Sequence, residues 1–209
     1  MPIIHEYKAI YFHIGKTGGV AIERELGIPA SDYKIYQPDI VYGLHEGVMT
    51  QHARPRYVES KTPPETYKDY FKFTFVRNPW DRMVSAYYYL YRINIKQHGS
   101  FEAWLINNHE HVVSKNYREG SHMIPQTEYT HSVTDKSKKH VDFIGRYENI
   151  QTDFNTLCEH IGKDPNDLRV LNNSGSRPAP TYREHYNEFT KQLVQEMYQD
   201  DIDILGYEF

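Results

Sequence analysis

Short β-prone runs alternate along the chain with stretches in which apolar residues recur at helical spacing. Three runs, at residues 9–14, 72–76 and 141–145, predict strands. Each is followed by a segment that predicts a helix, at residues 20–26, 80–92 and 149–161. Because repeated strand–helix units are typical of parallel sheets, the pattern predicts an α/β fold in three layers, with a mostly parallel central sheet flanked by helices.

The remaining segments have other patterns. Residues 100–105 open a further helix, and residues 187–205 predict one long amphipathic helix that Gly206 closes. Prolines recur between residues 28 and 70, so we expect loops and short elements there rather than a second core. Residues 107–138 are polar, rich in histidine and weakly periodic, which predicts a lid or a loop that faces a substrate.

Composition limits the range of folds and partners. A chain of 209 residues with 39% hydrophobic content predicts one domain, residues 1–209, able to bury about 70% of its unfolded surface. Cys158 lies on the apolar face of a predicted helix, so we expect a small core residue. It is the only cysteine, which excludes a disulfide within the chain.

Charge and hydropathy restrict location and partners further. The N-terminus lacks the basic and apolar regions of a signal peptide, and no window approaches the roughly 18 apolar residues of a membrane span. We therefore expect a soluble, cytoplasmic protein without a transmembrane segment. The net charge of −4 gives no general attraction to nucleic acid or to anionic membranes. An anionic ligand must accordingly be held by a local site.

The first candidate site is the run Gly15-Lys16-Thr17-Gly18-Gly19, between a predicted strand and a predicted helix. Unpaired backbone N–H groups at such a turn favour a bound anion, and Lys16 can reach its charged oxygens. The usual triphosphate loop would need glycine at position 10, where Ile10 stands inside the strand. Taken alone, the run is equally compatible with a glycine-rich turn that carries a surface lysine.

The second candidate site follows the next strand. Arg77 stands at its carboxyl end, and Ser85 lies about two turns into the following helix. A guanidinium fork with a hydroxyl donor suits a phosphate monoester. We expect Arg82, in the same helix, to pair with a carboxylate. Two anion sites on one sheet edge predict a ligand with two separated phosphates.

Together the two segments resemble the sulfotransferase family, in the branch of heparan-sulfate 2-O-sulfotransferase-like, related carbohydrate and small bacterial enzymes. In that family, [I]-P-K-[T]-[GA]-[GS]-[TS]-[S] binds the 5′-phosphosulfate of 3′-phosphoadenosine 5′-phosphosulfate (PAPS), and R-N-P-x-x-R-x-x-S-x-[Y] binds its 3′-phosphate. Residues 77–87 match the second motif at every specified position, and the similarity extends to residues 141–149 and 205–209. The resemblance implies a P-loop-like fold and sulfonate transfer from PAPS to a hydroxyl, with a saccharide as acceptor and no metal.

The first motif departs from the family at three positions. Gly15 replaces proline, Val20 replaces threonine or serine, and Ala21 replaces serine. Backbone amides can still grip a phosphosulfate. The hydroxyl lost at Val20 costs about 1–3 kcal/mol if its phosphate oxygen gains no other partner.

The resemblance assigns roles to residues of the two motifs. Lys16 is the candidate to stabilise the leaving oxygens, while the backbone amides from Gly18 to Ala21 would hold the 5′-phosphate. Thr17, Gly18, Gly19 and Val20 are the cradle residues expected to bind the donor. Arg77 and Ser85 would fix the 3′-phosphate.

A catalytic base is implied between the two motifs. His52, in Gln51-His52-Ala53, resembles the K-H-A-T segment of small bacterial members and is our candidate. His45 and Glu46 are alternatives. We expect His13, inside the first strand, to be a core-edge residue with one bonded nitrogen.

Later segments offer further candidates. Residues 174–177, followed by Tyr182 and Arg183, resemble the family loop that closes over the nucleotide. Arg183 could contact the phosphates or an acidic acceptor. The equally open alternative is a solvated side chain. Residues 126–129 are candidates to face the acceptor.

Two other functions fit part of the pattern. A small-molecule kinase would need magnesium, held by Thr17 and an acidic residue at a strand end, yet Arg77 stands at that end. An inactive nucleotide-binding module is suggested by the altered residues Gly15, Val20 and Ala21. ATP and magnesium dependence would favour the kinase, and PAPS binding without transfer would favour the module.

Overall fold

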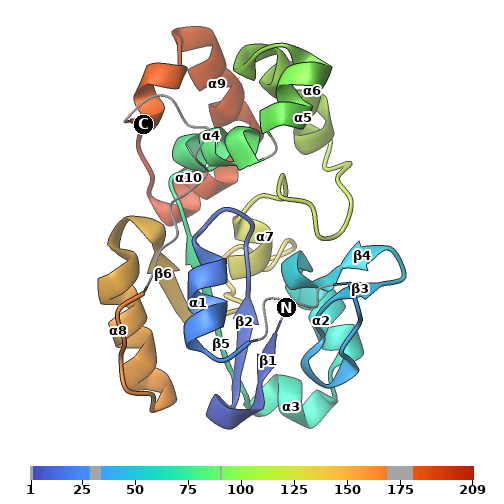
Figure 1. Cartoon of the computed structure of the whole chain (residues 1–209), viewed down its shortest axis with the longest axis vertical. Coiled ribbons are helices and arrows are strands. Elements are labelled where there is room, and N and C mark those ends of the chain that lie inside the picture. Colours follow the sequence, from blue (N-terminus) through green and yellow to red (C-terminus); the bar gives the residue numbers. More distant parts are fainter. Residues whose placement is uncertain (1, 29–33, 90, 169–180) are drawn as a thin grey trace.

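The computed structural model of the chain describes residues 2–28, 34–89, 91–168 and 181–209. Its main sheet has four strands in the order β1-β2-β5-β6 (Figure 1). The strands are β1 (Ile3–Ile4), β2 (Ala9–Phe12), β5 (Phe71–Val76) and β6 (Phe143–Arg146). β2, β5 and β6 run parallel, while β1 pairs antiparallel with β2 at the edge. The expected α/β fold with a mostly parallel sheet is confirmed.

The register brings the carboxyl ends of the parallel strands to one edge of the sheet. Phe12 of β2 pairs with Thr74 of β5, and Val76 of β5 pairs with Arg146 of β6. β5 is therefore the central strand of the parallel set, and its last four residues are buried. The turn after β2 and the turn after β5 leave the same edge, where ligands bind in open parallel sheets.

Helices cover both faces of the sheet. One face packs against α1 (Gly19–Glu25) and α8 (Ile150–Ile161), and Cys158 of α8 lies in this core, as expected. The other face packs against α2 (Pro55–Lys61), the short helix α7 (Thr127–Thr130) and α10 (Gln199–Leu205). This gives the three layers that the pattern predicted.

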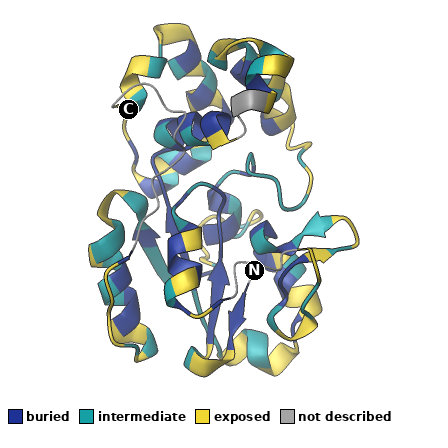
Figure 2. Cartoon of the chain, in the orientation of Figure 1, coloured by how far each residue is buried: buried dark blue, intermediate teal, exposed yellow. Residues whose placement is uncertain are grey.

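Beyond the carboxyl edge of the sheet, a third core joins α4 (Pro79–Tyr89), α6 (Phe101–Val113) and α9 (Glu188–Met197) (Figures 1 and 2). α5 (Tyr91–His98) packs against α4 and α6. Trp80, Tyr87, Trp104 and Val194 are buried in it. No helix in the described ranges is both long and apolar enough to cross a membrane.

One predicted helix is divided in the structure, because the segment expected at 187–205 forms α9 and α10. The segment expected at 80–92 is helical in α4 and α5, on either side of residue 90, which lies outside the described residues. The break between α9 and α10 falls at Tyr198, whose φ of −129° and ψ of 31° are not helical. Its buried hydroxyl donates to the backbone oxygen of Met123 at 3.0 Å. Tertiary packing of one tyrosine thus accompanies a break that apolar periodicity did not predict.

The segments expected to be irregular carry short elements. Residues 28–70 hold the hairpin β3 (Leu44–His45) and β4 (Val48–Met49), then α2 and α3 (Pro64–Asp69). Residues 107–113, which we expected to belong to a loop, complete α6 instead. The remainder, from Ser114 to Gln126, crosses between the helical region and the sheet without regular structure.

Candidate active site

The turn between β2 and α1 forms the predicted cradle. Lys16 and Gly18 have φ values of 71° and 84°, in the left-handed region. A Cβ atom on Gly19 would overlap the ring of His13, and one on Gly18 would lie 2.5 Å from Cδ1 of Ile150. Within the described residues, the backbone N–H groups of positions 17–20 donate no hydrogen bond, whereas that of Ala21, which we also expected to bind the phosphate, donates to Gly18 O at 3.0 Å. Four unpaired donors at one turn suit an anion.

Two side chains of the cradle differ in what they can offer a ligand. Thr17 is fully buried, and its hydroxyl donates to the backbone oxygen of Ile14 at 2.8 Å. That side chain holds the turn together, so its backbone N–H is the group left for a ligand. The side chain of Val20 is about half exposed.

Lys16 extends from the cradle toward α4. Its Nζ lies 3.8 Å from the ring centroid of Tyr89. Burial, together with the neighbouring charge of Arg77, lowers the pKa of Lys16 to about 8. A bound anion would favour the charged lysine and raise this pKa again.

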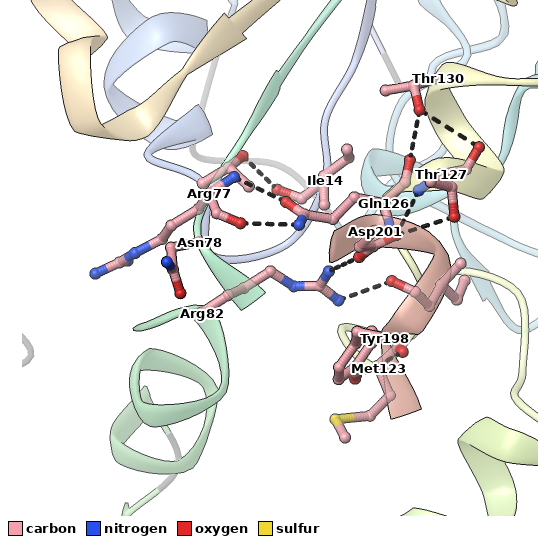
Figure 3. Close-up of polar contacts among 12 residues, drawn as sticks. Ile14, Arg77, Asn78, Arg82, Met123, Gln126, Thr127, Thr130, Tyr198 and Asp201 are labelled. Carbon is pink, nitrogen blue, oxygen red and sulfur yellow. Dashed lines mark hydrogen bonds and ion pairs between the residues drawn. The ribbon is translucent and has the colours of Figure 1, made fainter. Parts of the chain in front are cut away.

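Arg77 follows the last residue of β5 and connects the two predicted anion sites. Gln126 holds its backbone, because its amide accepts from Arg77 N and donates to Arg77 O, both at 2.8 Å (Figure 3). The guanidinium Nη1 donates to the backbone oxygen of Lys16 at 3.1 Å. Nε and Nη2 contact Oδ2 of Asp81 at 2.8 and 2.7 Å, and the group stacks 3.9 Å from the Tyr147 ring centroid. The two motifs therefore meet at this side chain.

Ser85 lies on the helix face that meets both cations. Asp81, Ser85 and Tyr89 are spaced four residues apart along α4, so they share one face. Asp81 contacts Arg77 and Tyr89 contacts Lys16. Ser85 is half-buried between them.

Tyr182 and Arg183 begin a short 3-10 helix, Tyr182–His185, that packs against α4. Burial, above all, raises the pKa of Tyr182, and the nearby carboxylate of Asp81 acts in the same direction. Tyr182 therefore lies beside the Arg77 segment. Arg183 is exposed and lies 4.8 Å from the Tyr182 ring centroid. The predicted loop at 174–177 lies outside the described residues.

His52 is buried between two other histidine rings. Its centroid lies 4.5 Å from that of His13 and 4.7 Å from that of His122, both in edge-on arrangements. Nδ1 lies 3.0 Å from the backbone oxygen of His13, and because a carbonyl only accepts, Nδ1 carries the proton. Nε2 then holds the lone pair and bonds to no described residue. Burial and the two neighbouring histidines hold the pKa of His52 well below 6.5.

The other early candidates lie elsewhere. His13 is buried, with Nδ1 2.6 Å from Oε1 of Glu23. His45 lies on the β3–β4 hairpin, where Nδ1 contacts the Tyr57 hydroxyl at 2.9 Å. Glu46 is exposed on the same hairpin. Neither His45 nor Glu46 reaches the cleft that His52 lines.

That cleft, of about 480 Å³, opens beside the cradle. It is lined by Met49, Gln51, His52, Ala86, Tyr89, Asn94, Trp104, Asn108, Gly120, Ser121, His122 and Met123. Sequence reasoning missed His122, because its segment has no periodicity. The glycine at position 15 was the one indication of a close neighbour, since a Cβ there would lie 2.5 Å from Cδ2 of His122. Burial and the charge of Lys16 lower the pKa of His122 to about 3.

A family model described as "Sulfotransferase family" matches residues 2–208. The chain belongs to the sulfotransferase family. It is 24% identical over 188 residues to Carbohydrate sulfotransferase 14 of Danio rerio, which covers 77% of this chain and 51% of that relative. It is also 30% identical over 119 residues to an uncharacterized protein of Archaeoglobus fulgidus. That match covers 57% of this chain and 89% of the relative. The chain thus spans about half the length of the zebrafish relative. No solved structure gives a significant match.

Residues 126–129 support the site rather than line the cleft. Thr127 bonds to Asp201 through its backbone N–H and its hydroxyl, at 2.8 and 2.9 Å. Glu128 pairs with Arg54 at 2.6 Å. The hydroxyl of Tyr129 donates to the backbone oxygen of His52 at 2.8 Å. None of these four residues lines the cleft beside His52, and their part in acceptor binding stays a prediction.

Asp201 of α10 is the buried centre of a further network (Figure 3). It accepts from the backbone N–H groups of Gln126 and Thr127. Nη1 of Arg82 lies 3.6 Å from its Oδ2, so Arg82 pairs with a carboxylate as expected. Nη2 of Arg82 donates to the backbone oxygens of His122 and Ile124. Through this network α10 fixes the backbone on both sides of Met123.

Proposed function

We propose that this sulfotransferase moves a sulfonate group from PAPS to a hydroxyl of a saccharide held in the cleft. The observation that carries the proposal is the hydrogen bond from Arg77 to the backbone oxygen of Lys16. It joins an anion cradle to a guanidinium on one sheet edge, as a nucleotide with separate 3′- and 5′-phosphates requires. The name of the zebrafish relative supports a carbohydrate acceptor.

The residues at the sheet edge fit such a donor. The four N–H groups of positions 17–20 and the Lys16 ammonium suit a 5′-phosphosulfate. Arg77 and Ser85 suit the 3′-phosphate, with Tyr182 beside them. Asp81 shares the Arg77 guanidinium, so it competes with a bound phosphate for part of this group.

His52 and Lys16 would serve the two ends of the transfer. The acceptor hydroxyl gives its proton to Nε2 of His52 as its oxygen forms a bond to sulfur. The bond between sulfur and the 5′-phosphate oxygen breaks, and Lys16 stabilises the charge that develops there. The Nδ1 bond to the His13 oxygen keeps His52 in the tautomer that this step needs.

Isothermal titration with adenosine 3′,5′-bisphosphate tests the donor. The wild type should bind, and Arg77→Ala should weaken binding by tenfold or more, because charged hydrogen bonds contribute about 1.5–3 kcal/mol. Arg56→Ala removes the same charge from a side chain that is 73% exposed outside the site and should bind normally. Absence of binding to the wild type would refute the proposal.

The kinase alternative loses support from the geometry of Thr17. A magnesium site would use its hydroxyl, yet this group is buried and bonded to Ile14. The inactive-module alternative rests on Val20, where a hydroxyl donor is absent. Transfer of labelled sulfonate from PAPS to any acceptor, without dependence on ATP and magnesium, would exclude both.

A further inference from the structure

The structure describes twelve residues that line the cleft, and none of them carries a charge at neutral pH. Ten are Met49, Gln51, Ala86, Tyr89, Asn94, Trp104, Asn108, Gly120, Ser121 and Met123, and the other two are His52 and His122. Low pKa values keep both histidines neutral. A cleft for an anionic polymer would be expected to offer arginine or lysine to each carboxylate or sulfate. The described lining offers neither.

Each of the three amides of the cleft donates one N–H of its NH2 group within the protein. Asn94 donates to the backbone oxygen of Tyr87 at 2.7 Å, and Asn108 donates to that of Trp104 at 2.8 Å. Gln51 donates to Oε2 of Glu23 at 2.7 Å. Because each partner can only accept, the orientation of each amide is fixed. Their three carbonyl oxygens accept no hydrogen bond from any residue that the structure describes.

The cleft therefore presents four acceptors of fixed orientation, beside the hydroxyls of Tyr89 and Ser121, which can also donate. Three amide oxygens and Nε2 of His52 all require a donor from the ligand. Hydroxyl groups are donors, whereas ionised carboxylates and sulfates only accept. The buried ring of Trp104 and the exposed ring of Tyr89 add apolar surface of the kind that sugar rings contact.

Three cations near the cleft have partners of their own. Lys16 and Arg77 belong to the proposed donor site, where the phosphates of the nucleotide would neutralise them. Arg54 is bonded to Glu119 and Glu128. A polyanionic donor bound next to the cleft would repel a second anion, and the described lining carries no charge to offset that repulsion.

We propose that the acceptor is an uncharged, polyhydroxylated molecule, a neutral saccharide, whose hydroxyl groups donate to the amide oxygens of Gln51, Asn94 and Asn108. This inference rests on the proposed function and names the substrate class for the same site. It predicts discrimination against saccharides that carry carboxylates.

Transfer of labelled sulfonate from PAPS tests the inference directly. The acceptors are neutral hexasaccharides, hexasaccharides of the same linkages with a carboxylate on alternate residues, and simple phenols. We expect kcat/KM to favour the neutral set by about tenfold or more. Equal or greater activity on the carboxylated set, activity on phenols alone, or activity on none with the donor bound would overturn the inference. If adenosine 3′,5′-bisphosphate does not bind, the proposed function itself fails.

Asn108 and Asn107 provide a matched pair of variants. Both amides donate to the backbone oxygen four residues earlier, at 2.8 Å, but only Asn108 lines the cleft. Asn108→Lys should shift the ratio of kcat/KM toward the carboxylated acceptors by tenfold or more. Asn107→Lys adds the same charge at an exposed position and should leave the ratio near that of the wild type. An equal shift in both variants would contradict the assignment of the cleft.

Discussion

Nδ1 of His52 lies 3.0 Å from the backbone oxygen of His13, which leaves Nε2 of His52 as the nitrogen that can accept a proton. His13 lies two residues before Gly15, where the cradle begins. The bond therefore fixes the tautomer of the candidate base relative to the donor site. The role of His52 can therefore be tested through the pH dependence of the rate and through a variant that lacks the imidazole.

Replacing His52 by alanine should lower kcat by about 10²–10⁴-fold, the contribution typical of a general base. Affinity for adenosine 3′,5′-bisphosphate should stay within a factor of a few. Since the pKa of His52 lies well below 6.5, the wild-type rate should not fall from protonation of this group between pH 7.5 and 6.5. His45→Ala is the control, because His45 lies on the hairpin away from the cleft. Loss of activity in that variant alone would assign the base to His45.

Binding of the donor should take up a proton near pH 8. Lys16 has a pKa of about 8 in the free protein, and a bound phosphate favours its charged form. Affinity should therefore decline as the pH rises above 8, by up to about tenfold per pH unit. Titrations in buffers with different ionisation enthalpies would measure the proton uptake.

Lys16→Arg is the control for this proton uptake, because arginine stays charged throughout the range. The variant should bind without taking up a proton near pH 8. An unchanged uptake in Lys16→Arg would show that another group titrates.

Asp201 and its neighbour Asp200 should differ widely in their effect on stability. Asp201→Ala leaves the Arg82 guanidinium buried without its carboxylate and removes the acceptor of two backbone N–H groups. We expect a loss of about 3–5 kcal/mol in the free energy of unfolding. Asp200 pairs with Lys136 in an exposed contact, so Asp200→Ala should cost about 0–1 kcal/mol. Urea unfolding would compare them, and similar costs would contradict the buried network.

Gly15 and His122 should be energetically coupled. A Cβ on residue 15 would lie 2.5 Å from the His122 ring, so Gly15→Ala should destabilise the protein by about 1–3 kcal/mol through overpacking. In a His122→Ala background the same change should cost much less. A double-mutant cycle measured by urea unfolding gives the coupling energy, and additive costs would disprove the contact.

Local patterns predicted the parts of the fold that depend on sequence neighbours. The strands around Tyr11 and Phe75 and the helix around Phe154 have strong periodicity, and each formed close to its expected bounds. The donor motifs were recognisable for a related reason, since a strand, a turn and a helix place Lys16 and Arg77 on one edge. Both sites follow from short stretches of chain.

The cleft depends on contacts between distant segments, and the sequence predicted little of it. His122 lies in a stretch without periodicity, where only the glycine at position 15 indicated a bulky neighbour. The division between α9 and α10 accompanies the buried bond from Tyr198 to Met123, which no local rule contains. The roles of residues 126–129 were obscured for the same reason, because Asp201, Arg54 and Arg77 are remote in sequence.

The irregular segment from Gly120 to Met123 is held at both ends by buried bonds. On one side Glu119 is bonded to Arg54, and on the other Arg82 grips the backbone oxygens of His122 and Ile124. These attachments use the backbone or residues outside the cleft wall, and the donor cradle lies on a separate turn. Under the proposed function, the acceptor wall and the donor turn therefore lie on different stretches of sequence that meet at His122 and Tyr89. Wall residues away from these two contacts are the ones whose exchange would change the acceptor while leaving the nucleotide site in place.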